Sequence, residues 1–268
     1  MISGVDNRQT GRWGWLPLLL LWFCLPAKGL ASEDRVLRIG YVEFPPLEYQ
    51  DGNRRAAGSF IELTRKVAAE AGYQVEFVYL PISRTYFYLK NGVIDLWPGL
   101  TEVPELQGYV LESAVTPIPV KLSAWSLRDT PPVTRFETFN EQILILISGY
   151  TYGGLVDYLE QSDNIRVSYA PNHLAALYML ERNRGHYLLD YQFPIREVMA
   201  DYDIEGLREH PLRTRYTAWL FSRQSPGAER IRRRFDDAYR RLAERNEVPP
   251  PVTRGQSYLL PGFPALSE

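Results

Sequence analysis

Six residues combine a side chain that can bind a small molecule with a position near the end of a predicted strand. An aromatic ring can stack on a ligand, a guanidinium can pair with an anion, and a carboxylate can hold an ammonium group. Because the carboxyl ends of parallel strands face one ligand crevice, we expect these side chains to line a shared cleft. The six residues are Phe44, Arg84, Thr101, Tyr150, Thr151 and Asp190.

The three candidates from the first part of the chain also have structural interpretations. Phe44 stands at a corner before two prolines, where it could stack on a ligand or belong to the core. Arg84 could bind an anion or be a surface arginine on a short helix. Thr101 could donate a hydrogen bond to a ligand or cap the turn that follows it. The sequence leaves each of these alternatives open.

The three candidates from the second part of the chain are equally open. Tyr150 and Thr151 stand between a predicted strand and a predicted helix, where free backbone N–H groups favour anions. Thr151 could instead be a plain N-cap. Asp190 could bind a ligand ammonium group or merely begin the helix at Gln192.

The sequence contains none of the common catalytic or metal-binding motifs. His173, His186 and His210 are scattered and lack the carboxylate or thiol companions of a metal site. There is no Gly-rich phosphate loop and no nucleophile elbow. We therefore expect a binding protein with no metal and no cofactor. The alternative is an enzyme in which Glu43 or Asp190 acts as general acid or base in the same cleft.

An alternation of strands and helices between residues 36 and 101 must position the first three candidates. It predicts strands at 36–42, 75–80 and 93–97, a helix over 61–71 and a shorter helix around Tyr86. The third strand should end at the turn Pro98-Gly99. This order is typical of a βαβ unit with parallel strands.

The same alternation starts again at residue 143 and predicts a second lobe. It places strands at 143–147, 165–169 and 187–189, with helices after 151 and around 175–180. Extended runs at 115–125 and 216–221 bracket this series, so the chain crosses twice between the lobes and forms a hinge. We expect an α/β protein with lobe 1 at 32–118 and 218–268, and lobe 2 at 119–217.

Residues 1–31 have the pattern of a secretory signal peptide. Arg8 and Arg12 precede an apolar run over 13–25, and small residues up to Ala31 offer a cleavage site. The run is short for a membrane span, which needs about 20 apolar residues; a retained anchor helix is the alternative. Cys24, the one cysteine in the sequence, would leave with the signal. A chain without disulfides is compatible with the bacterial periplasm, where we expect the protein to reside.

The net charge of the chain gives no indication of a basic surface that binds nucleic acid. The sequence has 30 Lys and Arg against 32 Asp and Glu, a formal charge of −2. Loss of residues 1–31 removes three basic residues and one acidic residue, which changes the charge to −4. An arginine-rich helix that runs to about Arg245 is expected to expose a solvated face. We expect no nucleic acid partner.

Several short motifs resemble the bacterial extracellular solute-binding proteins of family 3. The motifs are Leu37-Arg38-Ile39-Gly40, Phe44-Pro45-Pro46-Leu47, Gly58 with Ile61-Glu62-Leu63, Gly72, residues 75–78, and residues 89–95. The similarity covers residues 36–101 well and is weaker through the second lobe. There, Ser148-Gly149-Tyr150-Thr151 falls where the family binds its ligand with a Gly-Thr turn.

The resemblance implies a periplasmic binding protein of type II, with two lobes that are each a mostly parallel sheet flanked by helices. It implies a monomer that captures a small polar ligand by hinge closure and serves an ABC permease or a membrane sensor. Relatives on this fold include periplasmic dehydratases and a domain of lytic transglycosylases, which keeps the enzyme alternative open. Within the resemblance, Phe44 matches the family's ligand-stacking aromatic residue.

One departure from the family bears directly on the ligand. The family holds a ligand α-carboxylate with an arginine in a Thr-x-x-Arg-like segment after the third strand, where this sequence has Val103 and Leu106. We therefore expect ordinary L-amino acids to bind weakly or not at all. Arg84 could supply a substitute cation for a polar or partly aromatic solute that carries its anionic group elsewhere.

Overall fold

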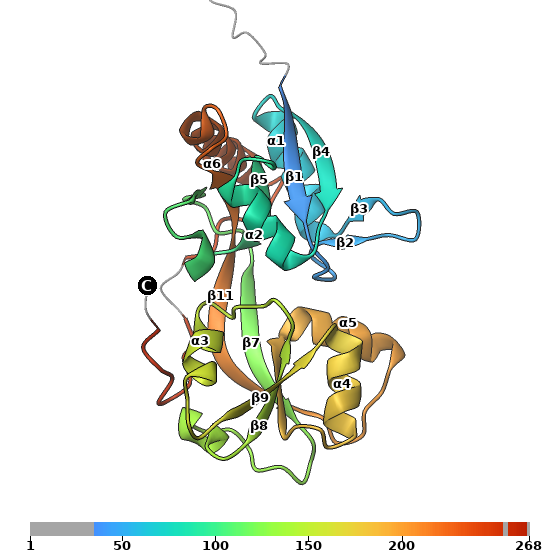
Figure 1. The fold of residues 1–268 in the computed structure, drawn as a ribbon. Coiled ribbons are helices and arrows are strands. Elements are labelled where there is room, and N and C mark those ends of the chain that lie inside the picture. Colours follow the sequence, from blue (N-terminus) through green and yellow to red (C-terminus); the bar gives the residue numbers. More distant parts are fainter. Residues whose placement is uncertain (1–34, 254–256, 267–268) are drawn as a thin grey trace, which may run out of the picture. The chain divides into compact units, whose positions relative to one another are not determined.

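The computed structural model of the protein describes residues 35–253 and 257–266. The predicted signal peptide, residues 1–31 with Cys24, lies outside the described residues. The described chain is an α/β fold in which one long sheet has the strand order β4-β1-β5-β11-β7-β10-β8-β9, with β6 paired to β11 (Figure 1). No helix within the described residues is both long and apolar enough to cross a membrane.

The first lobe is the part built on β1, β4, β5 and β6. Its elements are β1 (Val36–Tyr41), β2 (Tyr49–Gln50), β3 (Ala56–Ala57), α1 (Ser59–Glu70), β4 (Gln74–Tyr79), α2 (Ile82–Lys90), β5 (Leu96–Leu100), a 3-10 turn (Pro104–Leu106), β6 (Val110–Glu112) and α6 (Ala228–Glu244). β1 pairs in parallel with β4 along its whole length and with β5 at Ile39. Apolar residues such as Leu37 and Ile39 are fully buried, as parallel sheets require.

The third predicted strand was misplaced by three residues. Asp95 ends a turn instead of lying within the strand, because its buried carboxylate accepts hydrogen bonds at 2.8 Å from the Arg38 backbone and from the Ser225 hydroxyl. Pro98 lies inside β5 and does not end it. β1 pairs with β5 only at Leu96, so the missing N–H of Pro98 leaves that ladder intact.

Two strands, β7 (Pro119–Ser126) and β11 (Arg208–Ser222), cross between the lobes and run side by side in Figure 1. β11 pairs antiparallel with β7 through its first half and with β5 and β6 through its second half. Its 15 residues extend over about 50 Å. The sequence predicted only 216–221, because the preceding residues are largely polar and include Pro211, beside which the pairing is irregular.

The second lobe is the part built on β8, β9 and β10. Its elements are a 3-10 turn (Phe136–Phe139), β8 (Ile143–Ile147), α3 (Leu155–Glu160), β9 (Arg166–Ala170), α4 (His173–Glu181), β10 (Tyr187–Tyr191) and α5 (Gln192–Asp201). β8 pairs in parallel with β9 and β10, and β10 pairs antiparallel with β7. On one face, Ile145 and Leu188 pack with Leu177 and Leu180 of α4.

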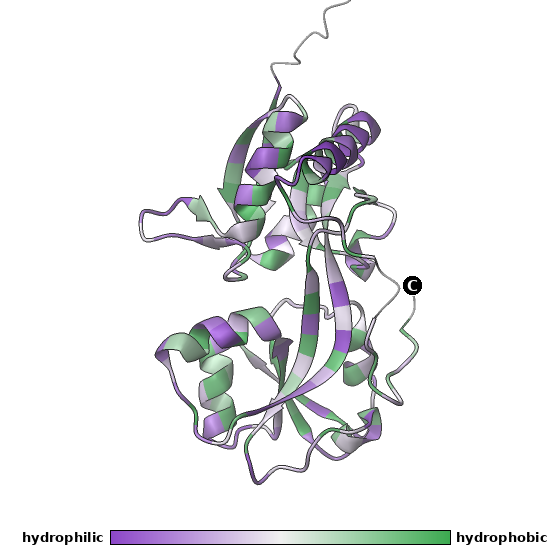
Figure 2. Cartoon of the chain, turned by 180° about the vertical axis from the view of Figure 1, so that it is seen from behind, coloured by the Kyte–Doolittle hydropathy of each residue, from purple (hydrophilic) through white to green (hydrophobic). Residues whose placement is uncertain are grey.

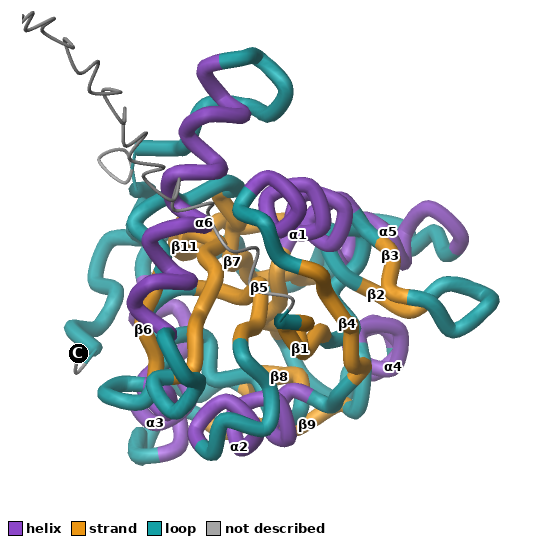
Figure 3. Tube along the Cα trace, turned by 90° about the horizontal axis from the view of Figure 1, so that it is seen from above, coloured by secondary structure: helices purple, strands orange, loops and turns teal. Residues whose placement is uncertain are grey.

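Helix α6 has the two faces that the sequence predicted. Ile231, Phe235, Tyr239 and Leu242 are buried, while the rest of the helix is coloured largely hydrophilic in Figure 2. Seen from above in Figure 3, α6 lies beside α1. Glu70 at the end of α1 forms ion pairs at 2.9 Å with Arg241 in α6 and with Arg245 just after it.

Candidate ligand-binding site

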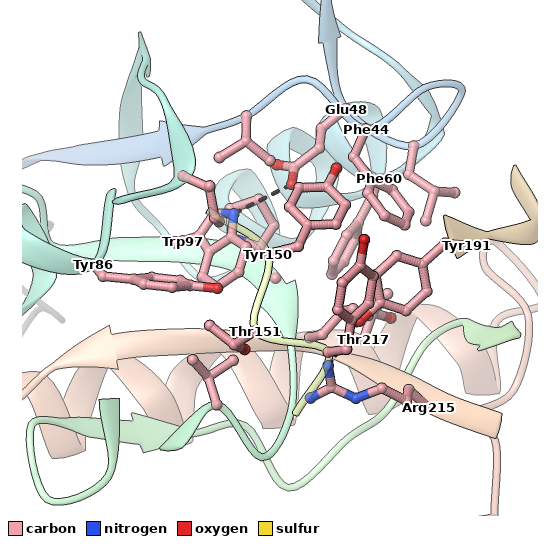
Figure 4. Close-up of a pocket in the computed structure, with 18 residues that line it drawn as sticks. Phe44, Glu48, Phe60, Tyr86, Trp97, Tyr150, Thr151, Tyr191, Arg215 and Thr217 are labelled. Atoms are coloured by element: carbon pink, nitrogen blue, oxygen red, sulfur yellow. Dashed lines mark hydrogen bonds between the residues drawn. The ribbon is translucent and has the colours of Figure 1, made fainter. Parts of the chain in front are cut away.

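A cavity lies where loops of both lobes meet the crossing strand β11 (Figure 4). The volume open to the centre of a water molecule is about 40 Å³, which holds only a few waters. Seven of the 18 lining residues are aromatic, and they come from both lobes. The lining residues include Phe44, Glu48, Phe60, Tyr86, Trp97, Tyr150, Thr151, Tyr152, Tyr191, Arg215 and Thr217.

Phe44 brings the first lobe into contact with the second. The corner after β1 folds back so that the Phe44 N–H donates to the Glu48 carbonyl at 2.7 Å, which directs the ring inward. The ring is only 7 % exposed and lies 5.3 Å from the Tyr191 ring and 6.4 Å from the Tyr150 ring, centroid to centroid. The predicted aromatic residue therefore lines the cavity and is also a core residue, and its stacking on a ligand stays a prediction.

Tyr150 and Thr151 come from the loop between β8 and α3 and also line the cavity. A Cβ atom at Gly149, which has a φ of +83°, would lie 2.8 Å from a methyl carbon of Ile82 in the first lobe. This glycine therefore allows the loop to approach α2 closely. The Tyr150 hydroxyl donates to the Glu43 carbonyl at 3.3 Å, across the lobes. Burial, and next the Asp190 charge, raise the pKa of Tyr150 well above its usual range, so the hydroxyl remains a donor.

Asp190 lies beneath the cavity wall and does not line it. Its side chain is fully buried, with one oxygen 2.6 Å from His173 Nδ1 and the other accepting the Tyr191 N–H at 2.7 Å. Burial lowers the pKa of His173, but Asp190 and then Glu43 raise it by more, so its pKa lies above the ordinary value. No group of three His, Cys, Asp or Glu side chains that could hold a metal is found in the described part of the chain.

Arg215 is a cation of the cavity that the sequence did not predict. It lies on β11 just before the predicted run 216–221 and is 3 % exposed. Its guanidinium donates to the Tyr191 hydroxyl of the second lobe at 2.9 Å, and to the carbonyls of Thr101 and, at 3.0 Å, Glu102 after β5. Arg215 therefore links both lobes. Its position two residues after Arg213, at the start of an apolar run, was the signal in the sequence.

Glu48 is the second ionisable residue of the wall, after Arg215, that the sequence did not predict. It follows the Phe44 corner and is 3 % exposed. Its Oε1 accepts a hydrogen bond from Trp97 Nε1 at 3.2 Å, and its Oε2 has no hydrogen-bond partner among the described residues. Desolvation raises the pKa of Glu48 well above its usual range, while the Trp97 indole and the Val42 backbone amide lower it by less. Burial therefore disfavours the charged form of this carboxyl.

Of the three predicted residues in the first lobe, two do not line the cavity. Arg84 is exposed on α2. Thr101 is 1 % exposed; its N–H donates to the Tyr216 carbonyl at 2.9 Å, and its own carbonyl accepts from Arg215. The structure thus brings Phe44, Tyr150 and Thr151 together in the wall and leaves Arg84, Thr101 and Asp190 outside it.

The segment that replaces the family's carboxylate-binding motif offers no charge to the cavity. Val103 lines the cavity, and Leu106 is 1 % exposed in the core. Leu106 also borders a larger hollow of about 570 Å³ on which residues 259–266 lie. In that hollow, Arg213 and Glu102 pair with each other at 2.6 Å. We take the smaller cavity as the candidate site because aromatic side chains of both lobes, including Phe44 and Tyr191, line it.

The fold and this cavity between two lobes define a class, the two-lobed periplasmic solute-binding proteins. Residues 37–185 match the model of the bacterial extracellular solute-binding proteins, family 3, and the chain belongs to this family. The family and fold predicted from the sequence are thereby confirmed. A comparison with curated proteins finds no match.

Solved structures of similar fold come from sensors and from transport proteins. A histidine kinase sensor domain with similarity to periplasmic binding proteins matches with a TM-score of 0.71 and 19 % identity, over 81 % of this chain and 93 % of that one. A substrate-binding protein of an ABC uptake transporter from Streptococcus pneumoniae, with bound histidine, gives 0.67 and 17 % over 81 % and 90 %. An ancestral arginine-binding protein bound to arginine gives 0.64 and 16 % over 79 % and 93 %. At these identities the similarity concerns the fold.

Proposed function

We propose that the protein captures a small polar solute between its lobes and presents it to a membrane partner, either an ABC permease or a sensor. The observation that carries this proposal is the contact of Phe44 with Tyr150 and Tyr191, because these rings close the cavity only when the lobes meet. Similar folds include a kinase sensor domain and a transport protein, which supports both kinds of partner.

We propose hinge closure on β7 and β11 as the mechanism, with lobe 1 at 32–118 and 218–268 and lobe 2 at 119–217. A ligand shifts the balance between open and closed forms only by its difference in affinity for the two. Contacts supplied by both lobes create such a difference. Of the six predicted residues, Phe44, Tyr150 and Thr151 would touch the ligand directly.

Two of the remaining predicted residues would not touch the ligand but would hold other residues of the site in position. Thr101 holds Arg215 through its carbonyl, and Asp190 holds His173, which lies 3.4 Å from the Tyr150 hydroxyl. A role for Arg84 stays a prediction from the sequence alone. We also propose that ordinary L-amino acids are not the ligand, because Leu106 stands in place of the arginine that would hold an α-carboxylate.

Closure can be tested by small-angle scattering combined with a thermal-shift screen of amino acids, organic acids and amines. A ligand at 100 times its dissociation constant adds about 2.7 kcal/mol to stability, and the same ligand should reduce the radius of gyration. A solute that stabilises the protein without changing its radius of gyration would contradict the hinge mechanism. Micromolar binding of glutamine, histidine or arginine would contradict the argument from Leu106.

Phe44→Ala and Phe87→Ala form a matched pair for the site. Phe44 is 7 % exposed against the rings of the second lobe, whereas Phe87 is 61 % exposed on α2. Phe44→Ala should abolish ligand-induced closure and reduce stability by about 3–5 kcal/mol, since it empties a buried position. Phe87→Ala should change neither. Closure that survives Phe44→Ala would place the ligand elsewhere.

We propose export to the periplasm, with cleavage after Ala31, as a monomer that binds its solute without converting it. The mass of the exported protein should correspond to residues 32–268, and light scattering should give one chain per particle. Retention of residues 1–31 would favour an anchored protein. Conversion of a bound solute during incubation would favour the enzyme alternative with Glu43 or Asp190.

A further inference from the structure

The charges in the cavity wall indicate which class of solute it accepts, provided that the proposed solute-binding function holds. We propose that the ligand is a small organic carboxylate with a flat, apolar body and no ammonium group, and that Arg215 holds its carboxylate. This assigns the ligand's anionic end to the crossing strand β11, not to Arg84 or to the loop that contains Leu106.

Arg215 is a buried cation without an acidic partner. Its hydrogen bonds go to a tyrosine hydroxyl and to two backbone carbonyls, and its Nε has no hydrogen-bond partner among the described residues. Within residues 35–253 and 257–266, no carboxylate forms an ion pair with it; the neighbouring Glu102 carboxylate pairs with Arg213 instead. Buried charges in proteins are normally paired. A ligand carboxylate would supply the missing counter-charge through a charge-assisted hydrogen bond.

The carboxylates in and near the wall are poorly suited to hold an ammonium group. Glu48 lines the cavity, but it is 3 % exposed, and this burial disfavours its charged form and raises its pKa well above the usual range. A neutral carboxyl can still donate its proton to a ligand oxygen. Asp190 is occupied by His173 and by the Tyr191 N–H beneath the wall, and Glu43 is exposed and does not line the cavity. An amine or an α-amino acid would therefore bury its ammonium group beside a carboxyl whose charged form burial disfavours.

The rest of the wall favours a flat apolar body. The Tyr86 and Trp97 rings lie 5.6 Å apart on one side, and the Tyr150 and Tyr191 rings lie 5.9 Å apart on the other. These are the centroid separations at which aromatic rings attract each other. Since about 40 Å³ is open in the closed form, a ligand must displace some of these rings, and another aromatic ring restores the contacts that are lost.

Three compounds with one shared aromatic body can test the charge preference. 3-Phenylpropanoate carries only the carboxylate, 2-phenylethylamine only the ammonium group, and L-phenylalanine both. Titration calorimetry on the exported protein should show 3-phenylpropanoate binding at least about tenfold more tightly than either of the others, a difference of about 1.4 kcal/mol. Equal or tighter binding of the amine or the amino acid overturns the proposal, and so does the absence of saturable 3-phenylpropanoate binding at millimolar concentration.

Variants of Arg215 test its role separately from its part in folding. Arg215→Gln should reduce the preference for 3-phenylpropanoate over 2-phenylethylamine from at least about tenfold to about onefold, whereas Arg215→Lys, which keeps the charge, should retain a preference with weaker affinity. Arg166→Gln removes the same charge from an exposed position on β9 and should leave the ratio unchanged. If Arg215→Gln fails to fold, Arg215→Lys decides: unchanged affinity for the carboxylate overturns the assignment.

The outcomes also separate this inference from the proposed function. If a solute of another class reduces the radius of gyration while 3-phenylpropanoate does not bind, the ligand class is wrong and solute capture stands. If no solute of any class in the screen closes the protein, solute capture fails together with this inference.

Discussion

Replacing Asp190 with asparagine should destabilise the protein strongly, and the loss should depend on pH. The Asp190 side chain is fully buried and its partner His173 is 8 % exposed, so solvent screens their ion pair little. Removal of one partner from a buried pair costs about 3–5 kcal/mol, because the other charge is left uncompensated. We expect Asp190→Asn to lower the free energy of unfolding by that amount while His173 is protonated.

The pH dependence follows from the raised pKa of His173 in the folded protein. Burial lowers this pKa, and the stronger effects of Asp190 and then Glu43 raise it above the ordinary value; the Tyr150 hydroxyl also faces the ring. A group with a raised folded pKa contributes stability that is fully present below its unfolded pKa, about 6.5, and is lost as the pH rises through the folded pKa. Asp190→Asn removes the largest cause of the rise. Its cost should therefore fall to about 1–3 kcal/mol at alkaline pH, where only hydrogen bonds are lost.

Urea unfolding of the wild type and of Asp190→Asn, at about pH 5.5 and at about pH 9, measures this difference directly. Asp237→Asn is the control, because Asp237 and its partner Arg240 are 62 % and 49 % exposed. The control should cost about 0–1 kcal/mol at either pH. An equal cost of Asp190→Asn at both pH values would refute the argument that the pair is charged in the folded state.

Two further predictions concern the first lobe. Gly58→Ala should destabilise the protein by more than about 2 kcal/mol, because Gly58 has a φ of +116° and an added Cβ would lie 2.3 Å from the Leu47 carbonyl oxygen. Gly52 has open space around it, so Gly52→Ala should change the free energy of unfolding by less than about 1 kcal/mol in the same assay. Hydrogen bonds from Arg245 and then Arg241 lower the pKa of Glu70 to about 2. An NMR titration should find that value in the wild type and a value near 4.5 when both arginines are changed to glutamine, and an unchanged pKa in that variant would show that the ion pairs do not form in solution.

The sequence predicted the elements well where a local apolar pattern determines them. The strand over 143–147 coincides with β8, and the helix expected over 61–71 is α1, shifted by about two residues. Errors occurred where distant contacts decide the outcome. Asp95 delays the start of β5 because Arg38 and Ser225 come together around its carboxylate, which no local pattern reveals. The first half of β11 is held mainly by its partner β7 and carries no apolar run of its own.

The residues of the cavity also divide into those that a local sequence pattern predicts and those that depend on distant contacts. Phe44, Tyr150 and Thr151 follow strand ends in the sequence, and they line the wall. Thr101 and Asp190 also stand at strand ends, but their hydrogen bonds to Tyr216 and His173 hold them outside it. Glu48 looks like an ordinary surface glutamate in the sequence, and only the fold of the corner after β1 buries it beside Trp97. Arg215 was missed because β11 carries three arginines, and no local pattern shows which of them the loops of both lobes surround.

The position of Arg215 connects the choice of ligand with the motion of the hinge. In the family that the sequence resembles, the carboxylate-binding arginine lies in a loop of one lobe. Here the cation lies on β11, and its hydrogen bonds reach the Tyr191 hydroxyl in the second lobe and the Thr101 and Glu102 carbonyls in the first. Separation of the lobes breaks at least one of these contacts. A carboxylate on Arg215 would therefore have its full set of supporting contacts only in the closed form, which is the difference in affinity between two states that closure requires.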